Sequence, residues 1–203
     1  MKFHHLGDSA LLVETGNAAS AQHLRRALLQ EAIPGLRQLV PGMDTLLIAG
    51  DPLRFDPDAV AKRLPELLRT PLEAAKPRQH EIGVRYDGSD LQAIAEGLKM
   101  EVTEVVRRHT APLYTVAFLG FAPGFPYLIG LDPLLHLPRR ADPRTRVPAG
   151  SVALAGEFCG IYPGVSPGGW NLLGRSETEL FDPVRSPPAL LAPGDRVRFR
   201  ALP

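Results

Sequence analysis

Residues Gly120–Gly174 read GFAPGFPYLIGLDPLLHLPRRADPRTRVPAGSVALAGEFCGIYPGVSPGGWNLLG. Ten glycines and eight prolines make up about a third of these 55 residues, against about 12% in average proteins. Large apolar residues lie between them: Phe121, Phe125, Tyr127, Leu128, Val152, Ile161, Trp170 and Leu173. Flexible linkers of this composition lack such residues, so the stretch predicts rigid, specifically shaped loops on a β scaffold.

The segments before this stretch favour a domain of many short strands. We expect a strand at Glu81–Tyr86, one or two helices between Asp90 and His109, and a strand at Tyr114–Leu119. Short strands separated by turn-rich segments indicate a barrel or a sandwich. We therefore assign residues 78–203 to a mainly β domain.

The first part of the chain contains two successive ββα patterns. Strands are expected at Lys2–Leu6 and Ala10–Glu14, then a helix near Ala18–Gln30. A second strand pair, Leu36–Val40 and Thr45–Ala49, precedes a helix that starts at Asp56-Pro57 and runs to about Arg69. The pattern predicts an α+β domain over residues 1–77, with helices packed on one side of a sheet.

Composition indicates a globular protein and restricts its partners. Hydrophobic residues make up 44% of the chain, and the net charge is only +1. No basic stripe favours nucleic acid, and no stretch approaches the roughly 18 to 20 apolar residues of a membrane span. We expect a cytoplasmic protein that binds neither nucleic acid nor membrane. Its single cysteine, Cys159, excludes an internal disulfide, and no zinc-ligand spacing occurs, so no metal site is expected.

Two nucleophile motifs require attention. Gly164–Gly168 matches the G-x-S-x-G string of serine hydrolases, but that elbow needs a following helix and a later histidine, and no histidine follows His136. A cysteine hydrolase built on Cys159 needs a base such as His109 or His136, which the sequence alone does not place. A small buried residue is the better interpretation of Cys159.

Arginines and glycines of the Gly/Pro-rich stretch predict a site for a small anion. Arginine binds carboxylate or phosphate in a bidentate way, and consecutive glycines expose backbone N–H groups. The candidate substrate- or phosphate-binding residues are Arg139, Arg140, Arg144, Arg175, Gly168, Gly169, Phe125 and Trp170. The alternative is that the arginines pair with surface carboxylates and that Trp170 belongs to the core.

Three long motifs carry a family resemblance: LGFAPGFPYLIGL (119–131), PRRADPRTRVPAGSVALAGEFCGIYP (138–163) and SPGGWNLLGRSETELFD (166–182). LGDSALLVE (6–14) and PPALLAPGDRVRF (187–199) extend it to nearly the whole chain. The sequence resembles the KipI / allophanate hydrolase subunit 1 family. The resemblance implies an α+β N-terminal domain followed by a cyclophilin-like β-barrel domain.

The resemblance also implies an activity. Family members serve as the B subunit of bacterial 5-oxoprolinase, which hydrolyses 5-oxo-L-proline to L-glutamate with ATP as co-substrate, with or without Mg²⁺, and with no tightly bound cofactor. The expected partners are its A and C subunits and the small-molecule substrate. On this basis His109, Tyr162 and Ser166 are candidates to orient substrate or to complete a partner's site. The chain alone is expected to be inactive.

Two other roles and one departure stay open. Family members are also known as KipI-type histidine-kinase inhibitors and as accessory subunits of allophanate or urea-amide hydrolases. The family often reads GQTGIYP or EQTGIYP where this chain has Phe158 and Cys159 before Gly160. Replacement of that polar pair puts the identity of the substrate in more doubt than the fold.

Overall fold

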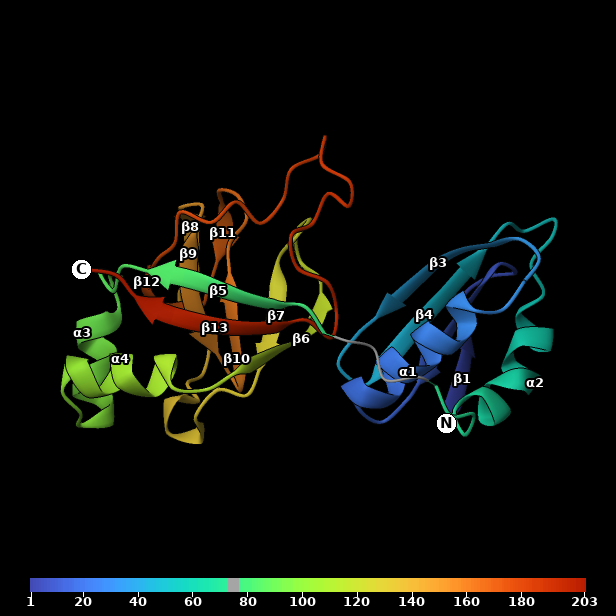
Figure 1. Cartoon of the computed structure of the whole chain (residues 1–203), viewed down its shortest axis with the longest axis horizontal. Helices are drawn as coiled ribbons and strands as arrows, with labels where there is room; N and C mark the ends of the chain where they lie inside the picture. Colours follow the sequence, from blue (N-terminus) through green and yellow to red (C-terminus); the bar gives the residue numbers. More distant parts are fainter. Residues whose placement is uncertain (73–76) are drawn as a thin grey trace. The chain divides into compact units, whose positions relative to one another are not determined.

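A computed structural model describes residues 1–72 and 77–203 (Figure 1). The chain forms two compact units, Met1–Lys76 and Pro77–Pro203, and each has its own hydrophobic core. Along the described part of the chain, no helix is both long and apolar enough to cross a membrane.

The first unit is a four-stranded antiparallel sheet with two helices packed against it. The strand order is β1-β2-β4-β3. The elements are β1 (Lys2–His5), β2 (Ala10–Glu14), α1 (Ala18–Leu29), β3 (Leu36–Pro41), β4 (Thr45–Gly50) and α2 (Pro57–Leu67). Every strand and helix predicted for this part of the chain is present, with bounds shifted by a few residues at most.

Local signals explain both helix starts. Asn17 caps α1 by accepting a hydrogen bond from the Ser20 N–H at 2.8 Å. Asp56 caps α2 through the N–H groups of Asp58 and Ala59, and Pro57 takes the first helical position, where its missing N–H costs nothing. Apolar residues at helical spacing then bury one face of each helix against the sheet.

The second unit is built on a seven-stranded sheet in the order β12-β9-β10-β7-β6-β13-β5. Its strands are β5 (Gln79–Val84), β6 (Tyr114–Leu119), β7 (Pro126–Ile129), β9 (Ser151–Ala155), β10 (Phe158–Ile161), β12 (Asn171–Arg175) and β13 (Arg196–Ala201). The β8 (Arg144–Val147) and β11 (Ser166–Gly168) strands form a separate two-stranded sheet. The helical segments are α3 (Leu91–Leu98), α4 (Val102–Thr110) and the 3₁₀ turn η1 (Pro133–Leu135).

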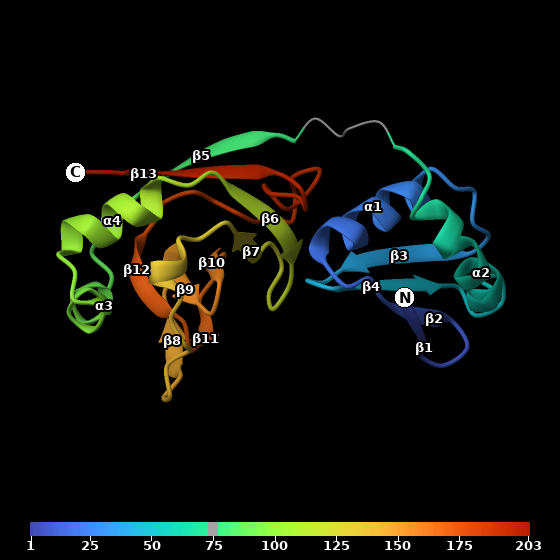
Figure 2. The ribbon, with the colours of Figure 1, turned by 90° about the horizontal axis from the view of Figure 1, so that it is seen from below.

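This sheet curls into a nearly closed barrel, and Figure 2 shows its strands arranged around the core. Arg85, directly after the edge strand β5, exchanges two backbone hydrogen bonds with Arg175 of the opposite edge strand β12, at 2.9 and 2.8 Å. These bonds join the two edges of the sheet at one point. The barrel alternative of the sequence prediction is therefore confirmed over the sandwich.

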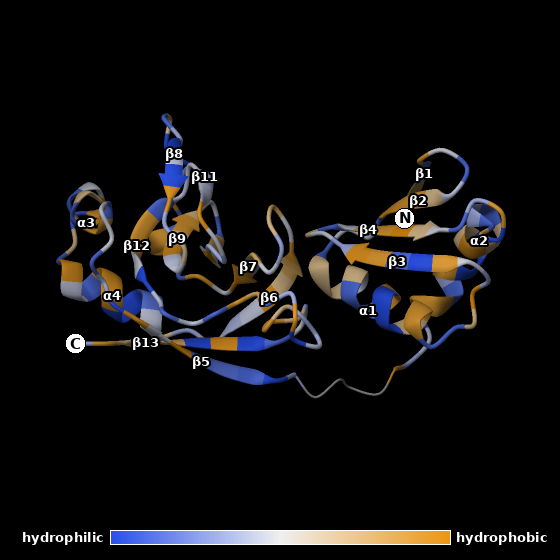
Figure 3. Cartoon of the chain, turned by 90° about the horizontal axis from the view of Figure 1, so that it is seen from above, coloured by the Kyte–Doolittle hydropathy of each residue, from blue (hydrophilic) through white to orange (hydrophobic). Residues whose placement is uncertain are grey.

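The barrel core contains apolar side chains from the sheet together with residues of α3 and α4. All five residues of β9 are buried, whereas β8 carries two arginines, and Figure 3 shows the resulting contrast between a hydrophobic β9 and a largely hydrophilic β8. A second cluster lies apart from the main core and includes the aromatic residues Phe125, Tyr162 and Trp170. This cluster builds the wall of the candidate site.

Candidate functional site

A cavity of about 320 Å³ opens beside the aromatic cluster of the barrel unit. We call it the aromatic pocket; its lining residues are Phe121, Phe125, Tyr127, Arg139, Arg140, Pro143, Tyr162, Pro167, Gly168, Gly169 and Trp170. A largely apolar cavity of this size with a few polar groups is typical of a small-molecule site. Seven of the residues singled out from the sequence meet here: Phe125, Arg139, Arg140, Tyr162, Gly168, Gly169 and Trp170.

Edge-to-face ring contacts make the pocket wall rigid. The Phe125 ring lies 5.3 Å from Trp170 and 5.1 Å from Tyr162, centroid to centroid, at nearly right angles to both. Gly160 allows this arrangement, because a Cβ there would come within 2.8 Å of both the Phe125 and the Trp170 rings. Such aromatic pairs add roughly 0.5–1.5 kcal/mol each beyond the burial of their surface.

Gly168 has a similar role at the end of β11, beside Tyr162. A Cβ on Gly168 would overlap the Tyr162 hydroxyl, so only glycine lets the end of the strand lie this close to the phenol. Burial raises the pKa of Tyr162, although a hydrogen bond from the Trp170 backbone opposes the shift. Tyr162 is therefore a neutral hydroxyl group at the pocket wall and is not prepared to act as a base.

Phe121 is the strained residue of the pocket. Its φ of 67° lies in the left-handed region, which a bulky side chain rarely adopts, and its side chain is 62% exposed. Backbone hydrogen bonds on both sides hold this turn, from Gly120 N–H to Phe125 O and from Phe125 N–H to Ala122 O. Strain maintained by surrounding bonds, with an aromatic ring left in solvent at a cavity rim, points to a ligand or partner contact.

Arg139 and Arg140 bring positive charge to the pocket. The Arg140 N–H donates to Gly169 O at 2.8 Å, which ties the arginine segment to the glycine loop. The Arg140 guanidinium donates to Asp90 at 2.9 Å, whereas the Arg139 side chain makes no hydrogen bond or ion pair with any residue the structure describes. Arg139 is thus the cation most available to an anionic group in this pocket.

The other predicted arginines lie elsewhere. Arg144 and Arg175 line a second cavity of about 280 Å³, which we call the arginine pocket. Its lining residues are Asp87, Gly88, Ser89, Arg144, Arg146, Pro148, Ser151, Leu172, Gly174 and Arg175. The sequence suggested one anion site, but the structure divides its arginines between two pockets.

His109 belongs to neither pocket. It is fully buried at the end of α4, with Nδ1 2.7 Å from the Tyr86 hydroxyl and Nε2 3.2 Å from the Cys159 sulfur. Burial lowers the pKa of His109 to about 3 and raises the pKa of the Cys159 thiol. The two side chains therefore form a neutral, enclosed pair, and the proposal that His109 orients substrate finds no geometric support in this chain.

The same pair decides the cysteine-hydrolase alternative. A base does lie beside Cys159, but a reactive cysteine needs a lowered pKa and access, and this thiol has neither. His136 lies elsewhere, and its Nε2 is 3.2 Å from Leu131 O. Cys159 is therefore a small core residue whose thiol contacts His109.

Ser166 lies on β11, where it pairs with Val147 of β8. Its Oγ is buried, finds no hydrogen-bond partner among residues 1–72 and 77–203, and lines neither pocket. Because Ser166–Gly168 is itself a strand and no helix follows, the G-x-S-x-G string is not a nucleophile elbow. The predicted mismatch between this string and the elbow geometry is therefore confirmed.

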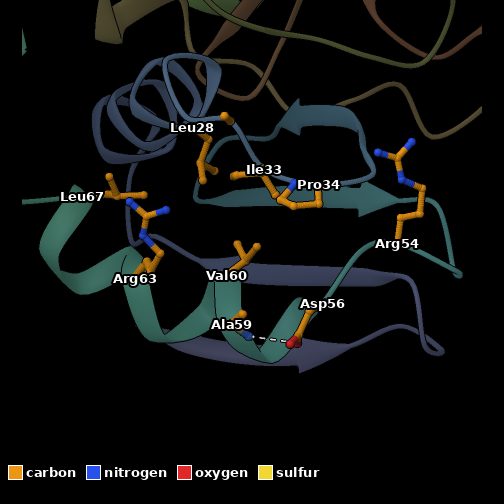
Figure 4. A pocket seen from close by; sticks show the side chains of 10 residues that line it. Leu28, Ile33, Pro34, Arg54, Asp56, Ala59, Val60, Arg63 and Leu67 are labelled. Carbon is orange, nitrogen blue, oxygen red and sulfur yellow. Dashed lines mark hydrogen bonds between the residues drawn. The ribbon is translucent and has the colours of Figure 1, made fainter.

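A third cavity, of about 180 Å³, lies in the first unit between α1, α2 and the loop after α1 (Figure 4). Its polar residues are largely in use: Asp56 caps α2, and Arg63 pairs with Glu31 at 2.6 Å. Around it the lining is mostly apolar, from residues such as Leu28, Val60 and Leu67. Nowhere in the described residues do three or more histidine, cysteine or acidic side chains gather as a metal site.

A family model described as carboxyltransferase domain, subdomain C and D, matches residues 1–191. The chain belongs to this family. Curated relatives named as the B subunit of 5-oxoprolinase are 39% identical in Escherichia coli O157:H7, covering 96% of this chain and 93% of the relative, and 34% identical in Bacillus subtilis strain 168, covering 98% and 91%. They confirm the family resemblance of the sequence motifs.

Solved structures agree with the fold. The crystal structure of TTHA0988 in space group P212121 is 44% identical in sequence and has a TM-score of 0.85. The match covers 96% of this chain but only 40% of TTHA0988. The conserved uncharacterized protein PH0987 from Pyrococcus horikoshii is 36% identical with a TM-score of 0.60, covering 99% and 97% of the two chains. The K. lactis urea amidolyase, 21% identical with a TM-score of 0.78 over 98% of this chain and 15% of its own, shows the fold alone.

Phe158 and Cys159, which depart from the usual family motif, lie on opposite faces of β10. Phe158 is partly buried and packs its ring edge against Tyr127, 5.5 Å between centroids, behind the aromatic pocket. Cys159 points to the other face of β10 and contacts His109 in the main core. Neither residue lines the aromatic pocket, but Phe158 packs against the cluster that forms its wall.

Sequence reasoning missed several pocket residues. Phe121 and Tyr127 stand out in the sequence only as interleaved apolar residues, although the short Phe121–Phe125 turn is rich in glycine and proline neighbours. Asp90, which pairs with Arg140 and Arg144, lies about 50 residues before them in the sequence. Its sequence neighbours do not indicate this pairing. Only the fold reveals that pairing.

Proposed function

We propose that this chain is the B subunit of an ATP-dependent 5-oxoprolinase, which hydrolyses 5-oxo-L-proline to L-glutamate together with its A and C subunits. The observation that carries the proposal is the near full-length match to relatives named as that B subunit. A subunit implies partner subunits in a complex, and their identity as A and C is part of the proposal.

We propose the aromatic pocket as the substrate site. The substrate class is a small ring with apolar methylene groups, a lactam and a carboxylate. Rings such as Trp170 and Phe125 suit the methylene groups, while the unpaired Arg139 suits the carboxylate. Arg140 is already held by Asp90, so its part is to fix the glycine loop through its own backbone N–H.

The chemistry we propose has three steps. The lactam oxygen attacks the γ-phosphorus of ATP, so that an O–P bond forms and ADP leaves. Water then adds to the lactam carbon and the C–N bond breaks, which leaves a γ-glutamyl phosphate with a free amine. A second water hydrolyses this acyl phosphate and releases inorganic phosphate and glutamate. Each step develops charge on oxygen atoms, which positioned guanidinium groups stabilise in the site. The chain's contribution is positioning and charge, and none of its described residues is proposed as a covalent nucleophile.

The two compact units are proposed to be two domains: an α+β domain over residues 1–77 and a cyclophilin-like barrel domain over residues 78–203. Separate hydrophobic cores support this division, and the nearly closed seven-stranded sheet supports the barrel. Expression of residues 78–203 alone, followed by thermal unfolding, tests it. A cooperative transition is expected, and a non-cooperative one would contradict the division.

The function is tested by glutamate release from 5-oxoproline and ATP, with this chain co-expressed with neighbouring A and C subunits and with a control that lacks this chain. Glutamate that depends on the chain is the expected result. A well-formed complex that releases no glutamate would overturn the proposal. It would favour another amide substrate or the role of a KipI-type kinase inhibitor.

A further inference from the structure

The arginine pocket holds an excess of positive charge outside the proposed substrate site. Arg144 and Arg146 are two residues apart on β8, so a strand's period of two places both on one face, while Val147 is buried on the other. Arg175 reaches the same cavity from β12. Three guanidinium groups from two strands therefore line one cavity of about 280 Å³.

Most of the donors in this pocket have no partner. The Arg146 and Arg175 side chains make no hydrogen bond or ion pair within the part of the chain that the structure describes. Arg144 donates through Nη2 to Asp90 at 2.6 Å and to Ser89 Oγ at 3.1 Å, but its Nη1 is buried and finds no partner in residues 1–72 and 77–203. Arg146 and Arg175 are therefore the exposed cations of this pocket that a ligand can reach.

The carboxylates near the pocket do not neutralise these three cations. Asp90 is almost fully buried and is shared by Arg140, Arg144 and the Leu172 N–H, which donates at 2.7 Å. Asp87 is the acidic residue of the lining itself. A cavity lined by more arginines than carboxylates favours an anion over a cation.

The backbone frame of the pocket is fixed before any ligand binds. Arg175 and Arg85 exchange two backbone hydrogen bonds, and the Gly88 N–H donates to Leu173 O at 3.1 Å. A side chain on Gly88 or Gly174 would overlap the neighbouring backbone, so glycine is required at both positions for this close approach. A rigid frame lowers the entropic cost of binding.

We propose that Arg144, Arg146 and Arg175 form a separate site for a phosphate-type oxyanion. The guanidinium fork matches phosphate geometry, and the exposed Arg146 and Arg175 have no partner among the described residues. Asp90 lies between the sites, because it holds Arg144 of this pocket and Arg140 of the aromatic pocket. Only the source of the anion, a nucleotide or free phosphate, rests on the proposed function.

The test is calorimetric titration of the full chain, without partner subunits, at low ionic strength. Inorganic phosphate should bind with a saturable isotherm, and the double variant R146Q/R175Q should weaken binding at least tenfold. Both arginines are exposed, so the variant is expected to fold. Arg198→Gln, the control for each single substitution, removes one positive charge from an exposed position on β13 and should bind phosphate as the wild type does. Absence of saturable binding, or an equal loss in Arg198→Gln, would overturn the site.

A second set of binding measurements distinguishes the two pockets and the two possible sources of the anion. Arg139→Gln removes charge from the aromatic pocket and should leave phosphate affinity within twofold; a loss equal to that of R146Q/R175Q would overturn the separation of the sites. ATP binding at least tenfold tighter than phosphate, with the same arginine dependence, identifies a nucleotide as the source, and equal or weaker binding identifies free phosphate. Because no substrate turnover is measured, failure here leaves the glutamate assay unaffected.

Discussion

The barrel unit holds two groups of chemically functional side chains, and they differ in burial and in hydrogen bonding. In the main core, Tyr86, His109 and Cys159 satisfy one another and His109 and Cys159 have no exposure. In the aromatic pocket, Arg139 has no side-chain partner among the described residues and Phe121 is largely exposed on a strained backbone. The residue types of an active site occur in the first group, but the unsatisfied groups that a ligand needs occur in the second.

The difference has an electrostatic cause. Transfer of a Cys–His pair into a dry interior disfavours both charged forms, so burial raises the thiol pKa and lowers the imidazole pKa. An ion pair of thiolate and imidazolium, which a cysteine hydrolase requires, is then the unstable state. The core pair contributes to folding, whereas the pocket arginines stay charged and accessible.

The largest expected effect is on stability, through the core group. His109→Ala removes a fully buried ring packed against Phe199 at 4.6 Å and leaves the Tyr86 hydroxyl without its partner. We expect a loss of about 3–5 kcal/mol in the free energy of unfolding, from the cavity and the orphaned group together. Urea denaturation measures it.

Tyr86→Phe is the matched control for this variant. It keeps the ring and removes only the hydroxyl, so about 1 kcal/mol is expected. A loss below about 1 kcal/mol for His109→Ala, or loss of turnover in a fully folded variant complex, would contradict a purely structural role.

The second effect is the dependence of stability on pH. The pKa of His109 is about 3 in the folded state, below its ordinary 6.5, so between these values the unfolded chain binds more protons. The stability that the neutral imidazole contributes is present above pH 6.5 and is lost as the pH falls. At about 1.4 kcal/mol for each pH unit, acidification from pH 6.5 to 4 removes about 3 kcal/mol.

The contrast with His109→Phe isolates this group from the carboxylates that titrate over the same range. The variant should lose less stability than the wild type between pH 6.5 and 4, measured by urea denaturation at each pH. Parallel pH curves for the two proteins would show that His109 is not held neutral by the fold.

Much of the fold could be predicted from the sequence because its signals are local. Asp56-Pro57 starts a helix by capping, and the Pro41-Gly42 turn lies between β3 and β4, where Gly42 N–H bonds to Thr45 O. Closure of the barrel could not be predicted in the same way. The bonds between Arg85 and Arg175 join residues 90 positions apart, and no local pattern encodes that meeting.

The candidate site was only partly predictable, for a similar reason. The composition of the Gly/Pro-rich stretch indicated six aromatic-pocket residues, and the family resemblance added Tyr162. His109 looked catalytic because of its residue type, and burial is a tertiary property that its sequence neighbours do not reveal. The sequence also does not show which pocket each arginine lines. For Arg144 this depends on the face of β8 on which its side chain lies, and the pairing of Arg144 with Gly168 sets that face.

The third effect concerns the aromatic pocket. Arg139→Gln should raise the KM for 5-oxoproline in the reconstituted complex by about 10- to 100-fold, because a bidentate charged contact to the carboxylate is lost. The free energy of unfolding should change by less than about 0.5 kcal/mol, since Arg139 is exposed and has no described partner. Steady-state kinetics and urea denaturation together check it, with Arg198→Gln as the charge-matched control. An unchanged KM would remove Arg139 from the site.

The smallest effect tests whether the pocket stores strain that the core lacks. Phe121→Gly and Phe121→Ala both remove the exposed ring, but only glycine adopts a φ of 67° without penalty. The glycine variant should therefore be more stable than the alanine variant by about 1 kcal/mol in urea denaturation, while both raise the KM for 5-oxoproline to a similar extent. The greater unfolded-state entropy of glycine opposes this difference by about 0.4–1 kcal/mol, so an alanine variant that is clearly the more stable one would mean that the turn is not strained. The difference between the two variants reports the backbone, and their shared change in KM reports the ring.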